Sequence, residues 1–297
     1  MKPKLLVILG PTASGKSDLA VEIAKRFDGE VVSADSRQVY KKLDIGTGKI
    51  TKREMNSVPH HLLDVANAKK RFSVAEYQHL ATNAIADILK RSKIPILCGG
   101  TGFFIDSIVK GTIIPEVKEN KTLRKKLSNK SAEELFTILS KLDPQRASQI
   151  DSKNSVRLIR AIEIAKELGS VPTLTTKSPN YEILQIGIAI NREMLLKNIT
   201  KRLYKRLKAG MVSESKKLHA DGLSWRRMYE LGLEYRALAK FLTNKITKSE
   251  LEKTIINESM DYAKRQMTWF KRDKNIKWFS LKEKPKILNG VKKFLNS

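Results

Sequence analysis

The sequence has a single cysteine and no long apolar run. Cys98 cannot form an internal disulfide and lacks neighbours with zinc-ligand spacing, so disulfide-stapled and zinc-finger scaffolds are excluded. We expect its thiol to fill the core. No stretch approaches the ~18 to 20 apolar residues of a membrane span, and the Met-Lys-Pro-Lys start lacks the apolar segment of a signal peptide. We therefore expect a cytoplasmic protein without membrane contact.

Acidic residues are also scarce. The 31 Asp and Glu face 58 Lys and Arg, which gives a formal net charge of +27 and a pI near 10.0. Residues 113–297 hold 40 of the basic and 20 of the acidic side chains. The excess predicts a polyanionic partner, for which nucleic acid is the best candidate. Any one cluster, such as residues 201–206, also fits a solvated helix face.

The apolar pattern indicates an α/β fold. A chain of 297 residues that is 41% hydrophobic can bury a sizeable core. Apolar runs alternate with helical periodicity in the first third, and this predicts a parallel sheet covered by helices. Further strand patterns interrupt or follow the helical second half. The predicted strands are residues 5–9, 30–34, 61–65, 94–98, 183–190 and 276–279.

The later part of the chain reads as mostly helical. Capping-box pairs of Ser or Thr with Glu three residues on, at Ser73, Ser131 and Thr247, predict helix starts. Pro115, Pro172 and Pro179 with Asn180 are the clearest breaks. We expect a first core segment over residues 1–112, a helical insertion over 113–182 and a helical remainder of the core over 183–297.

The most informative early motif follows the first predicted strand. Residues 10–17, GPTASGKS, match G-x-x-x-x-G-K-[ST] and precede an amphipathic helix. The glycines let backbone N–H groups turn inward, the helix N-terminus favours anions, Lys16 reaches phosphates and Ser17 can bind Mg²⁺. The motif predicts a phosphate chain but does not separate a kinase, an ATPase and an enzyme that uses a bare diphosphate.

A carboxylate follows the second predicted strand. Asp35 comes after the run 30–34, so we expect it at the carboxyl edge of the sheet, where open α/β sheets bind ligands. A turn-capping aspartate is the alternative. After the run 94–98, a glycine-rich turn allows close backbone approach, and Thr101 within it offers a hydroxyl to metal, diphosphate or base. His60 and His61 lack matching metal ligands, and we expect structural hydrogen bonds from them.

With these motifs the sequence resembles the tRNA dimethylallyltransferase family, whose members prenylate the adenosine beside the anticodon. The resemblance runs nearly end to end. It implies a P-loop NTPase-like core with a helical insertion, dimethylallyl diphosphate as the prenyl donor and tRNA as the partner. We expect a monomer, although the sequence itself does not set the oligomeric state. The resemblance rests on GPTASGKS (10–17), SADSRQVYKKLDIGTGK (33–49), PHHLLDV (59–65), GGTGFFI (99–105), RLIRAIEI (157–164), the Arg192 to Arg202 segment, GLEYR (232–236) and KRQMTWFK (264–271).

The resemblance also implies roles at matching positions. Asp35, Thr101 and Arg202 are the implied catalytic residues, with Asp35 set against the adenine amino group and Ser17 and Thr101 as ligands of Mg²⁺. The implied diphosphate site is Gly10, Pro11, Thr12, Ala13, Ser14, Gly15, Lys16 and Ser17. The implied tRNA contacts are Asp35, Ser36, Arg37, Gln38, Thr101, Arg124, Val156, Arg157, Leu158, Ile159, Arg160, Tyr235, Arg236, Lys264, Arg265, Gln266 and Trp269.

The chain departs from the family pattern at three positions. Glu234 stands where many members have glycine, Asn198 replaces a frequent arginine one turn before Arg202, and Val156 replaces a glutamine. We expect Asn198 to thin the positive charge around the leaving group. For Trp269, ordinary helix packing is as good an interpretation as stacking on a base.

Two other functions fit parts of the sequence. A small-molecule kinase that uses ATP would explain the phosphate loop but not the basic second half. A non-catalytic RNA-binding relative would explain the charge, but it would not need Lys16, Ser17, Asp35 and Thr101 together.

Overall fold

The computed structural model describes residues 2–178 and 180–297, and its centre is a six-stranded sheet. All neighbouring strands pair in parallel, in the order β3-β2-β4-β1-β5-β6. This confirms the predicted α/β architecture with a P-loop NTPase-like core. The strands are β1 (Lys4–Leu9), β2 (Gly29–Ala34), β3 (His60–His61), β4 (Ile94–Gly99), β5 (Glu182–Ile188) and β6 (Lys277–Phe279).

Strand β1 shows why the predicted strands read as continuous apolar runs. Leu5, Val7 and Leu9 pack into the core on one face of the sheet, whereas Leu6 and Ile8 pack into the core on the other. Successive side chains of a strand point to opposite faces, so a strand covered on both faces needs apolar residues throughout. The burial of all five side chains therefore fixes β1 at the middle of the sheet.

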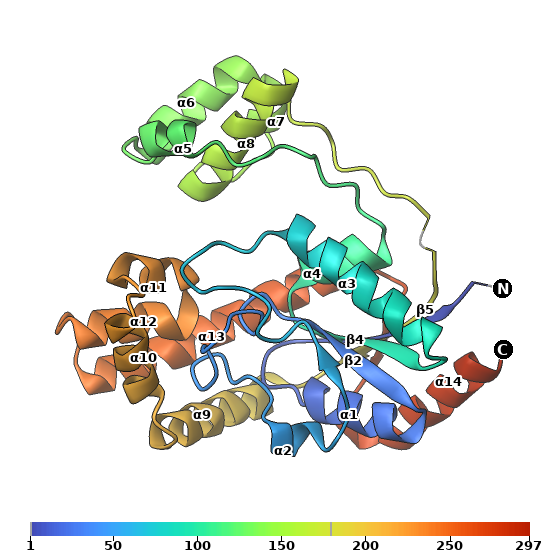
Figure 1. Cartoon of the computed structure of the whole chain (residues 1–297). Helices are drawn as coiled ribbons and strands as arrows, with labels where there is room; N and C mark the ends of the chain where they lie inside the picture. The colour runs from blue at the N-terminus through green and yellow to red at the C-terminus, as the bar shows by residue number, and fades with distance from the viewer. Residues whose placement is uncertain (1, 179) are drawn as a thin grey trace. The chain divides into compact units, whose positions relative to one another are not determined.

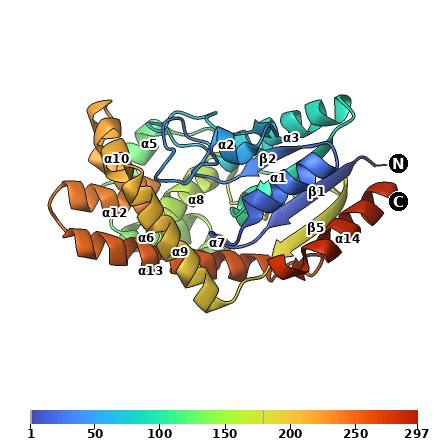
Figure 2. The same ribbon diagram turned by 90° about the horizontal axis from the view of Figure 1, so that it is seen from below.

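Helices cover both faces of this sheet (Figures 1 and 2). Helices α1 (Lys16–Arg26) and α14 (Lys284–Asn296) supply the apolar side chains of one face. Helices α3 (Val74–Lys90), α4 (Gly102–Val109) and α13 (Lys248–Phe270) contribute to the other. Cys98 lies buried in the first of these cores, as the sequence predicts, and burial raises the pKa of its thiol to about 11.

The capping boxes begin helices where the sequence places them. Ser73, Ser131 and Thr247 each accept a hydrogen bond from the third helical N–H, and the glutamate there accepts one from the cap residue. Each box satisfies two N–H groups that the first turn leaves without helical partners.

The predicted strand 61–65 is wrong in its extent. β3 consists of His60 and His61 alone, because Leu62 and Asp64 adopt positive φ angles of 64° and 58° and turn the chain away from the sheet. The two histidines make structural hydrogen bonds as predicted. His61 Nε2 bonds Glu30 Oε2 at 2.7 Å, and His60 Nδ1 bonds the Val58 carbonyl at 2.9 Å.

The remaining elements of unit 1, the part of the chain that contains the sheet, are four helices that follow β5 and two short elements in the loops between other strands and helices. Helices α9 to α12 follow one another in the sequence between β5 and α13, and α9 and α12 both pack against α13. Their bounds are α9 (Arg192–Lys208), α10 (Met211–Ala220), α11 (Trp225–Leu231) and α12 (Leu233–Leu242), and the short elements are α2 (Lys52–Met55) and the 3₁₀ turn η1 (Leu281–Glu283).

The chain divides into two compact units. Unit 1 comprises Met1–Gly111 and Ser178–Ser297, and unit 2 comprises Thr112–Lys177. The predicted boundary at residue 182 falls inside unit 1, since Glu182 already begins β5, and Pro179 lies outside the described residues. Unit 2 packs its own core around Leu135, Leu139 and Leu158. Its helices are α5 (Lys121–Leu127), α6 (Ala132–Leu142), α7 (Pro144–Ala147) and α8 (Ser155–Leu168).

Within residues 2–178 and 180–297, no helix combines the length and apolarity needed to span a bilayer.

Candidate active site

A cavity of about 790 Å³ lies in unit 1 at the carboxyl edge of the sheet. The segments 12–18, 98–100 and 189–191 line it, together with Asp35, and they stand at or just beyond the carboxyl ends of β1, β4, β5 and β2. Parallel strands bring these ends to one edge, which is where such sheets bind ligands. The structure thus brings the phosphate loop and Asp35 into one cavity, as the sequence predicts.

The loop of residues 10–17, hereafter the P-loop, has the backbone of an anion site. Ala13 and Gly15 adopt positive φ angles of 57° and 86°, which curl the chain between β1 and α1. Helix α1 begins at Lys16, and its N-cap Gly15 supplies no side-chain hydrogen bond, so no side chain of the cap competes for the first-turn N–H groups. These N–H groups and the positive end of α1 lie at the cavity and favour a phosphate.

Two side chains of the P-loop reinforce this interpretation. Lys16 Nζ donates to the Pro11 carbonyl at 2.6 Å, and burial, aided by the positive charge of Arg202, lowers the pKa of Lys16 to about 8. Among the described residues, the buried Oγ of Ser14 has no hydrogen-bond partner. A buried hydroxyl without a partner is costly, and a phosphate oxygen would satisfy it.

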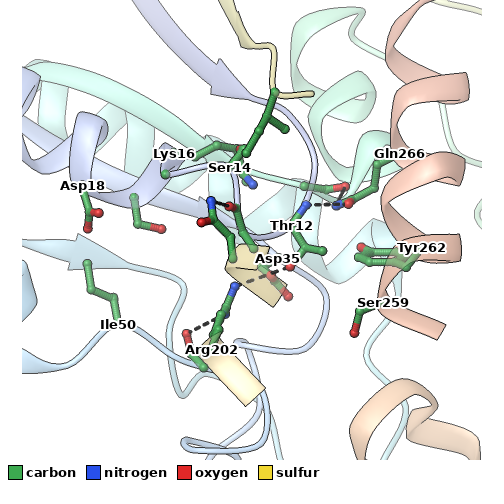
Figure 3. A pocket seen from close by; sticks show the side chains of 18 of the residues that line it. Thr12, Ser14, Lys16, Asp18, Asp35, Ile50, Arg202, Ser259, Tyr262 and Gln266 are labelled. Carbon is green, nitrogen blue, oxygen red and sulfur yellow. Dashed lines mark hydrogen bonds between the residues drawn. The ribbon is translucent and has the colours of Figure 1, made fainter. Parts of the chain in front are cut away.

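Asp35 lies at the predicted edge of the sheet and also caps a turn, which is the alternative interpretation. Its Oδ1 accepts hydrogen bonds from the N–H groups of Arg37, at 2.8 Å, and Gln38, at 3.3 Å, so this oxygen caps a turn. The carboxylate also lines the same cavity as the P-loop (Figure 3). A turn-capping carboxylate held by two amides is a well-oriented one, so the two interpretations are compatible.

Thr101 connects the turn after β4 to the turn after β2. Its Oγ1 accepts from the N–H of Ser36 at 3.0 Å and donates to Ser36 Oγ at 3.3 Å. Thr101 stands at the N-cap of α4, but its hydroxyl makes no capping bond there. The hydroxyl therefore braces the residue next to Asp35.

Arg202 enters the site from α9. Its guanidinium donates to Thr12 Oγ1 at 3.4 Å and to the carbonyls of Thr47 and Gly48, both at 3.3 Å. Burial, and after it the positive charge of Arg206, lowers the pKa of Arg202 to about 10. Arg202 remains cationic at neutral pH and joins the P-loop to the loop at residues 44–48 (hereafter the 44–48 loop).

The 44–48 loop is held from its other side by a carboxylate. Glu214 of α10 accepts hydrogen bonds from the N–H groups of Asp44, Ile45 and Gly46 at 2.7 to 3.0 Å. Three amides of the loop thus bond Glu214, while the carbonyls of Gly46, Thr47 and Gly48 accept from Arg202 and Arg206. The loop is therefore held between Glu214 and the guanidinium of Arg202 that also contacts the P-loop.

The structure accounts for two departures from the family pattern. Asn198 Nδ2 donates to the Ala13 carbonyl at 3.1 Å, so the amide supports the P-loop where an arginine would add charge. Glu234 forms an ion pair with Arg206.

Among the residues of the site that the sequence interpretation missed are two on α13. Ser259 and Tyr262 line the cavity from α13, and Figure 3 shows the Tyr262 ring directed toward Asp35. Burial, and after it the negative charge of Asp35, raises the pKa of Tyr262 to about 12, although a hydrogen bond with Thr101 opposes the shift. Spacing was the available signal, because Ser259, Tyr262 and Gln266 recur at intervals of three and four along one helix face.

The candidate tRNA contacts in unit 1 fall into two groups. Arg37 and Gln38 line the cavity, Ser36 is bonded to Thr101, Lys264 and Arg265 are exposed on α13, and Arg236 is half-buried with its guanidinium over the Tyr229 ring. The other group is buried. Side-chain contact of Tyr235 with RNA is wrong, because the side chain is 1% exposed and its hydroxyl donates to Glu214 at 2.8 Å.

Gln266 and Trp269 are also turned into the protein. Gln266 is 5% exposed and bonded to backbone groups of the active site, so its assignment as an RNA contact is wrong for the side chain. Trp269 Nε1 donates to Asp106 Oδ2 at 3.1 Å, and its ring packs against the core. The packing interpretation of Trp269 is the one that the structure favours.

Two of the candidate tRNA contacts in unit 2 bind a buried carboxylate instead. Arg124 and Arg160 both form ion pairs with Glu163, which is 2% exposed. Burial alone would raise the pKa of Glu163, but hydrogen bonds from Arg124, the Asn120 N–H and Arg160 outweigh it and lower that pKa. A contact of the Leu158 side chain with RNA is wrong, because the side chain has no exposed surface. Ile159 packs against the same core, whereas Val156 and Arg157 are exposed.

Of the two residues that the sequence suggested as Mg²⁺ ligands, Ser17 and Thr101, only one fits. Mg²⁺ takes oxygen ligands and retains waters, so one hydroxyl beside a diphosphate suits it. Ser17 in the first turn of α1 lines the cavity and fits, whereas Thr101 is not among the residues that line it and its hydroxyl bonds Ser36. The described residues contain no cluster of three His, Cys, Asp or Glu side chains able to hold a metal.

Comparisons with known proteins agree with this geometry. The model of the IPP transferase family matches residues 38–273. A tRNA dimethylallyltransferase 2 of Trichlorobacter lovleyi is 44% identical over 276 residues, which cover 92% of this chain and 90% of the relative. The tRNA dimethylallyltransferase of Halothermothrix orenii is 37% identical over 300 residues, with 97% and 92% covered.

Solved structures give the same result. The full-length tRNA isopentenylpyrophosphate transferase of Bacillus halodurans superposes with a TM-score of 0.75 at 36% identity and covers 99% of this chain and 97% of its own. A eukaryotic dimethylallyltransferase, described as acting on tRNA, gives a TM-score of 0.74 at 26% identity over 90% of this chain and 69% of its own.

Proposed function

The chain belongs to the IPP transferase family, and on that premise we propose that it transfers a dimethylallyl group from dimethylallyl diphosphate to a tRNA. The acceptor is N6 of adenosine 37, next to the anticodon. The products are N6-isopentenyladenosine and diphosphate, which makes the chain a prenyltransferase that modifies tRNA. We further propose that it works as a monomer in the cytoplasm, where tRNA is a polyanion suited to its charge of +27.

The reaction needs help mainly at the leaving group. The lone pair of N6 is delocalised into the adenine ring, so N6 is a weak nucleophile, and the allylic C–O bond must be largely broken in the transition state. N6 forms a bond to the allylic carbon, and the diphosphate departs with the electron pair of the C–O bond. Groups that stabilise negative charge on the diphosphate therefore lower the barrier most.

The P-loop supplies such groups in this chain. Its N–H groups from Ala13 to Ser17, the Lys16 ammonium and the Arg202 guanidinium lie around one end of the cavity. We propose that they hold the diphosphate before reaction and bind it more strongly as charge develops. Removal of one such donor from a preorganised site costs ~10² to 10³ in rate.

Asp35 lines the same cavity, and we propose that the acceptor base arrives beside it. One carboxylate oxygen caps the turn at Arg37 and Gln38, and we propose that the other accepts a hydrogen bond from N6. As the C–N bond forms, the proton on N6 becomes acidic and passes to Asp35. A general base of this kind contributes ~10² to 10⁴ in rate.

A stacked adenine cannot reach this cavity, so the base must leave the anticodon loop. Flipping costs little from a single-stranded loop. We propose that Arg37, Gln38, Lys264 and Arg265 contact the RNA around the cavity, and that the exposed Arg157 does so on unit 2.

Mg²⁺, when bound, would neutralise part of the charge on the diphosphate, and Ser17 is the residue of this chain that would hold it. We propose that Thr101 acts instead by positioning, because its hydroxyl fixes Ser36 and with it the turn that orients Asp35.

One observation carries the proposal: a phosphate-binding loop and an oriented carboxylate line the same cavity, on a chain with a large basic excess. The kinase alternative would need a nucleoside triphosphate in that loop, and the non-catalytic alternative leaves Asp35 and Lys16 without a role. The family membership favours neither.

Incubation with unmodified tRNA and dimethylallyl diphosphate, followed by digestion to nucleosides and mass spectrometry, tests the proposal. One dimethylallyl group gained on adenosine supports it. Consumption of ATP with phosphate transfer, in a parallel incubation without the prenyl donor, would support the kinase instead.

A further inference from the structure

We infer that Gln266 is a positioning residue that locks the P-loop to the turn after β4. The inference rests on the proposed function, because the P-loop is taken to hold the prenyl donor's diphosphate. It changes the role that the KRQMTWFK motif suggests, in which Gln266 lies among RNA contacts.

Both polar atoms of the Gln266 amide are used within the active site. Oε1 accepts a hydrogen bond from the Thr12 N–H at 2.8 Å, and Nε2 donates to the Gly100 carbonyl at 2.9 Å (Figure 3). The side chain is 5% exposed. A single amide thus bridges the loop after β1 and the turn after β4.

The turn after β4 is shaped to receive α13. A Cβ built on Gly100 would lie 2.2 Å from Gln266 Nε2, and one built on Gly102 would lie 2.2 Å from Trp269 Cδ1. The glycines therefore leave room for two side chains spaced three residues apart on α13. The sequence predicts close backbone approach at this turn, and in the structure the side chains that approach it are those of Gln266 and Trp269.

The bridge fixes which N–H groups of the P-loop are free for a ligand. The Thr12 N–H is directed to Gln266, so the phosphate-binding amides begin at Ala13. Thr12 is also held through its hydroxyl, which accepts from Arg202 at 3.4 Å. Gln266 and Arg202 thus hold Thr12 by its backbone and its side chain, and a loop held in this way is preorganised for an anion.

Helix α13 presents a different face to solvent. Lys264 and Arg265 immediately precede Gln266 and are exposed, whereas Gln266 is buried. The same motif therefore serves both purposes: its cations are available to RNA, and its amide holds the diphosphate site.

Binding of inorganic pyrophosphate by calorimetry tests the inference without turnover. Gln266→Met keeps the length of the side chain but leaves the Thr12 N–H and Gly100 carbonyl unpaired, and we expect pyrophosphate affinity to fall about tenfold, the equivalent of one lost hydrogen bond. In turnover assays, KM for dimethylallyl diphosphate should rise similarly, while the Kd for tRNA changes less than twofold.

Gln185→Met is the matched control. Gln185 of β5 is also 5% exposed, and its amide donates to Asp273 Oδ2, just after α13, at 3.1 Å. Neither residue lines the cavity. This variant loses a comparable buried bond and should bind pyrophosphate like the wild type. Thermal unfolding of both variants reports any general loss of structure.

Gly100→Ala keeps the test decisive if Gln266→Met folds poorly. The Cβ of this alanine would displace the Gln266 amide, so Gly100→Ala should weaken pyrophosphate binding. If both residues act through the same bridge, the double variant Gln266→Ala/Gly100→Ala should lose less affinity than the sum of the losses of the two single variants.

Unchanged pyrophosphate affinity in both Gln266→Met and Gly100→Ala, with weakened tRNA binding, would overturn the inference and restore Gln266 as an RNA contact. Absence of prenyl transfer by the wild type, with intact pyrophosphate binding that depends on Gln266, would reject the proposed function and leave the bridge standing.

Discussion

Arg206 donates through Nη1 to Glu234 Oε1 at 2.8 Å, and both side chains are mostly buried, at 11% and 14% exposed. Arg206 also donates to the carbonyls of Gly46 and Thr47, and the Thr47 carbonyl accepts from Arg202 as well. Glu234 therefore neutralises the second of two neighbouring arginines. Its negative charge raises the pKa of Arg202, whereas Arg206 lowers it. The negative charge of Glu234, which departs from the family pattern, is therefore balanced by Arg206 within the site.

We expect Glu234→Gln to leave Arg206 without its carboxylate, and to lower the free energy of unfolding by about 1 to 3 kcal/mol. The unpaired cation should then favour an anion in the cavity. Pyrophosphate should therefore raise the melting temperature of Glu234→Gln more than that of the wild type, by differential scanning fluorimetry. An equal or smaller rise would show that Arg206 does not act on the diphosphate site.

Asp35→Asn is expected to lower the rate of prenyl transfer by ~10² to 10⁴, because an amide cannot accept the N6 proton. Asparagine retains the oxygen that accepts from the Arg37 and Gln38 N–H groups, so it preserves the turn that alanine would remove. Single-turnover rates measure the loss, and filter binding should show tRNA affinity within a few-fold of the wild type.

Asp221→Asn is the control for this variant, because Asp221 lies on the surface and pairs with Lys42. It should react at the wild-type rate. Near-normal turnover by Asp35→Asn would remove Asp35 as the base.

The lowered pKa of Lys16 predicts a pH dependence of diphosphate binding. With a pKa of about 8, Lys16 is charged below pH 8 and mostly neutral above it. A diphosphate favours the charged form, so its affinity should fall as pH rises from 7 to 9, by up to about tenfold per pH unit above the pKa.

Calorimetry with inorganic pyrophosphate at pH 7, 8 and 9 measures this effect. Lys16→Met is the control, because it retains the titration of pyrophosphate itself and removes that of the lysine. Parallel pH profiles for the two proteins would mean that Lys16 does not contact the ligand.

The arginines of unit 2 are expected to separate into structural and RNA-binding ones. Arg160 donates to Glu163 and, through Nη2, to the Val117 carbonyl at 2.9 Å, so Arg160→Ala should lower the free energy of unfolding by about 1 to 3 kcal/mol. Arg157 is exposed, and Arg157→Ala should reduce the log–log salt slope of tRNA binding by about one unit without a loss of stability.

Salt titrations of tRNA binding and urea unfolding of both variants provide the comparison. A reduced salt slope for Arg160→Ala at unchanged stability would mean that Arg160 leaves Glu163 to bind a phosphate.

The sequence predicts the fold through features that are local or periodic. A strand covered on both faces must be apolar throughout, which is why β1 could be recognised, and the capping boxes mark the starts of helices because their geometry spans only four residues. The P-loop could be placed with its neighbours because strand ends in a parallel sheet share one edge. β3 was overextended because positive φ angles at Leu62 and Asp64 leave no signal in an apolar run.

The direction of each side chain was harder to predict. A motif that the sequence shares with a family indicates that its segment lies near the active site. It does not indicate which residues of the segment face the ligand. Leu158 could have been assigned to the core, because Leu158, Ala161, Ile162 and Ala165 follow helical spacing. The hydrogen bonds of Gln266 with the P-loop and of Glu214 with the 44–48 loop join residues far apart in sequence. No local sequence pattern encodes these bonds.

A crystal structure with an anticodon stem-loop and an unreactive thio-analogue of dimethylallyl diphosphate tests the central claim most directly. The account predicts diphosphate oxygens within hydrogen-bond distance of the N–H groups of residues 13–17, and the adenine N6 about 2.6 to 3.2 Å from the Asp35 carboxylate. A diphosphate bound outside the P-loop, or an adenine amino group beyond reach of Asp35, would contradict it.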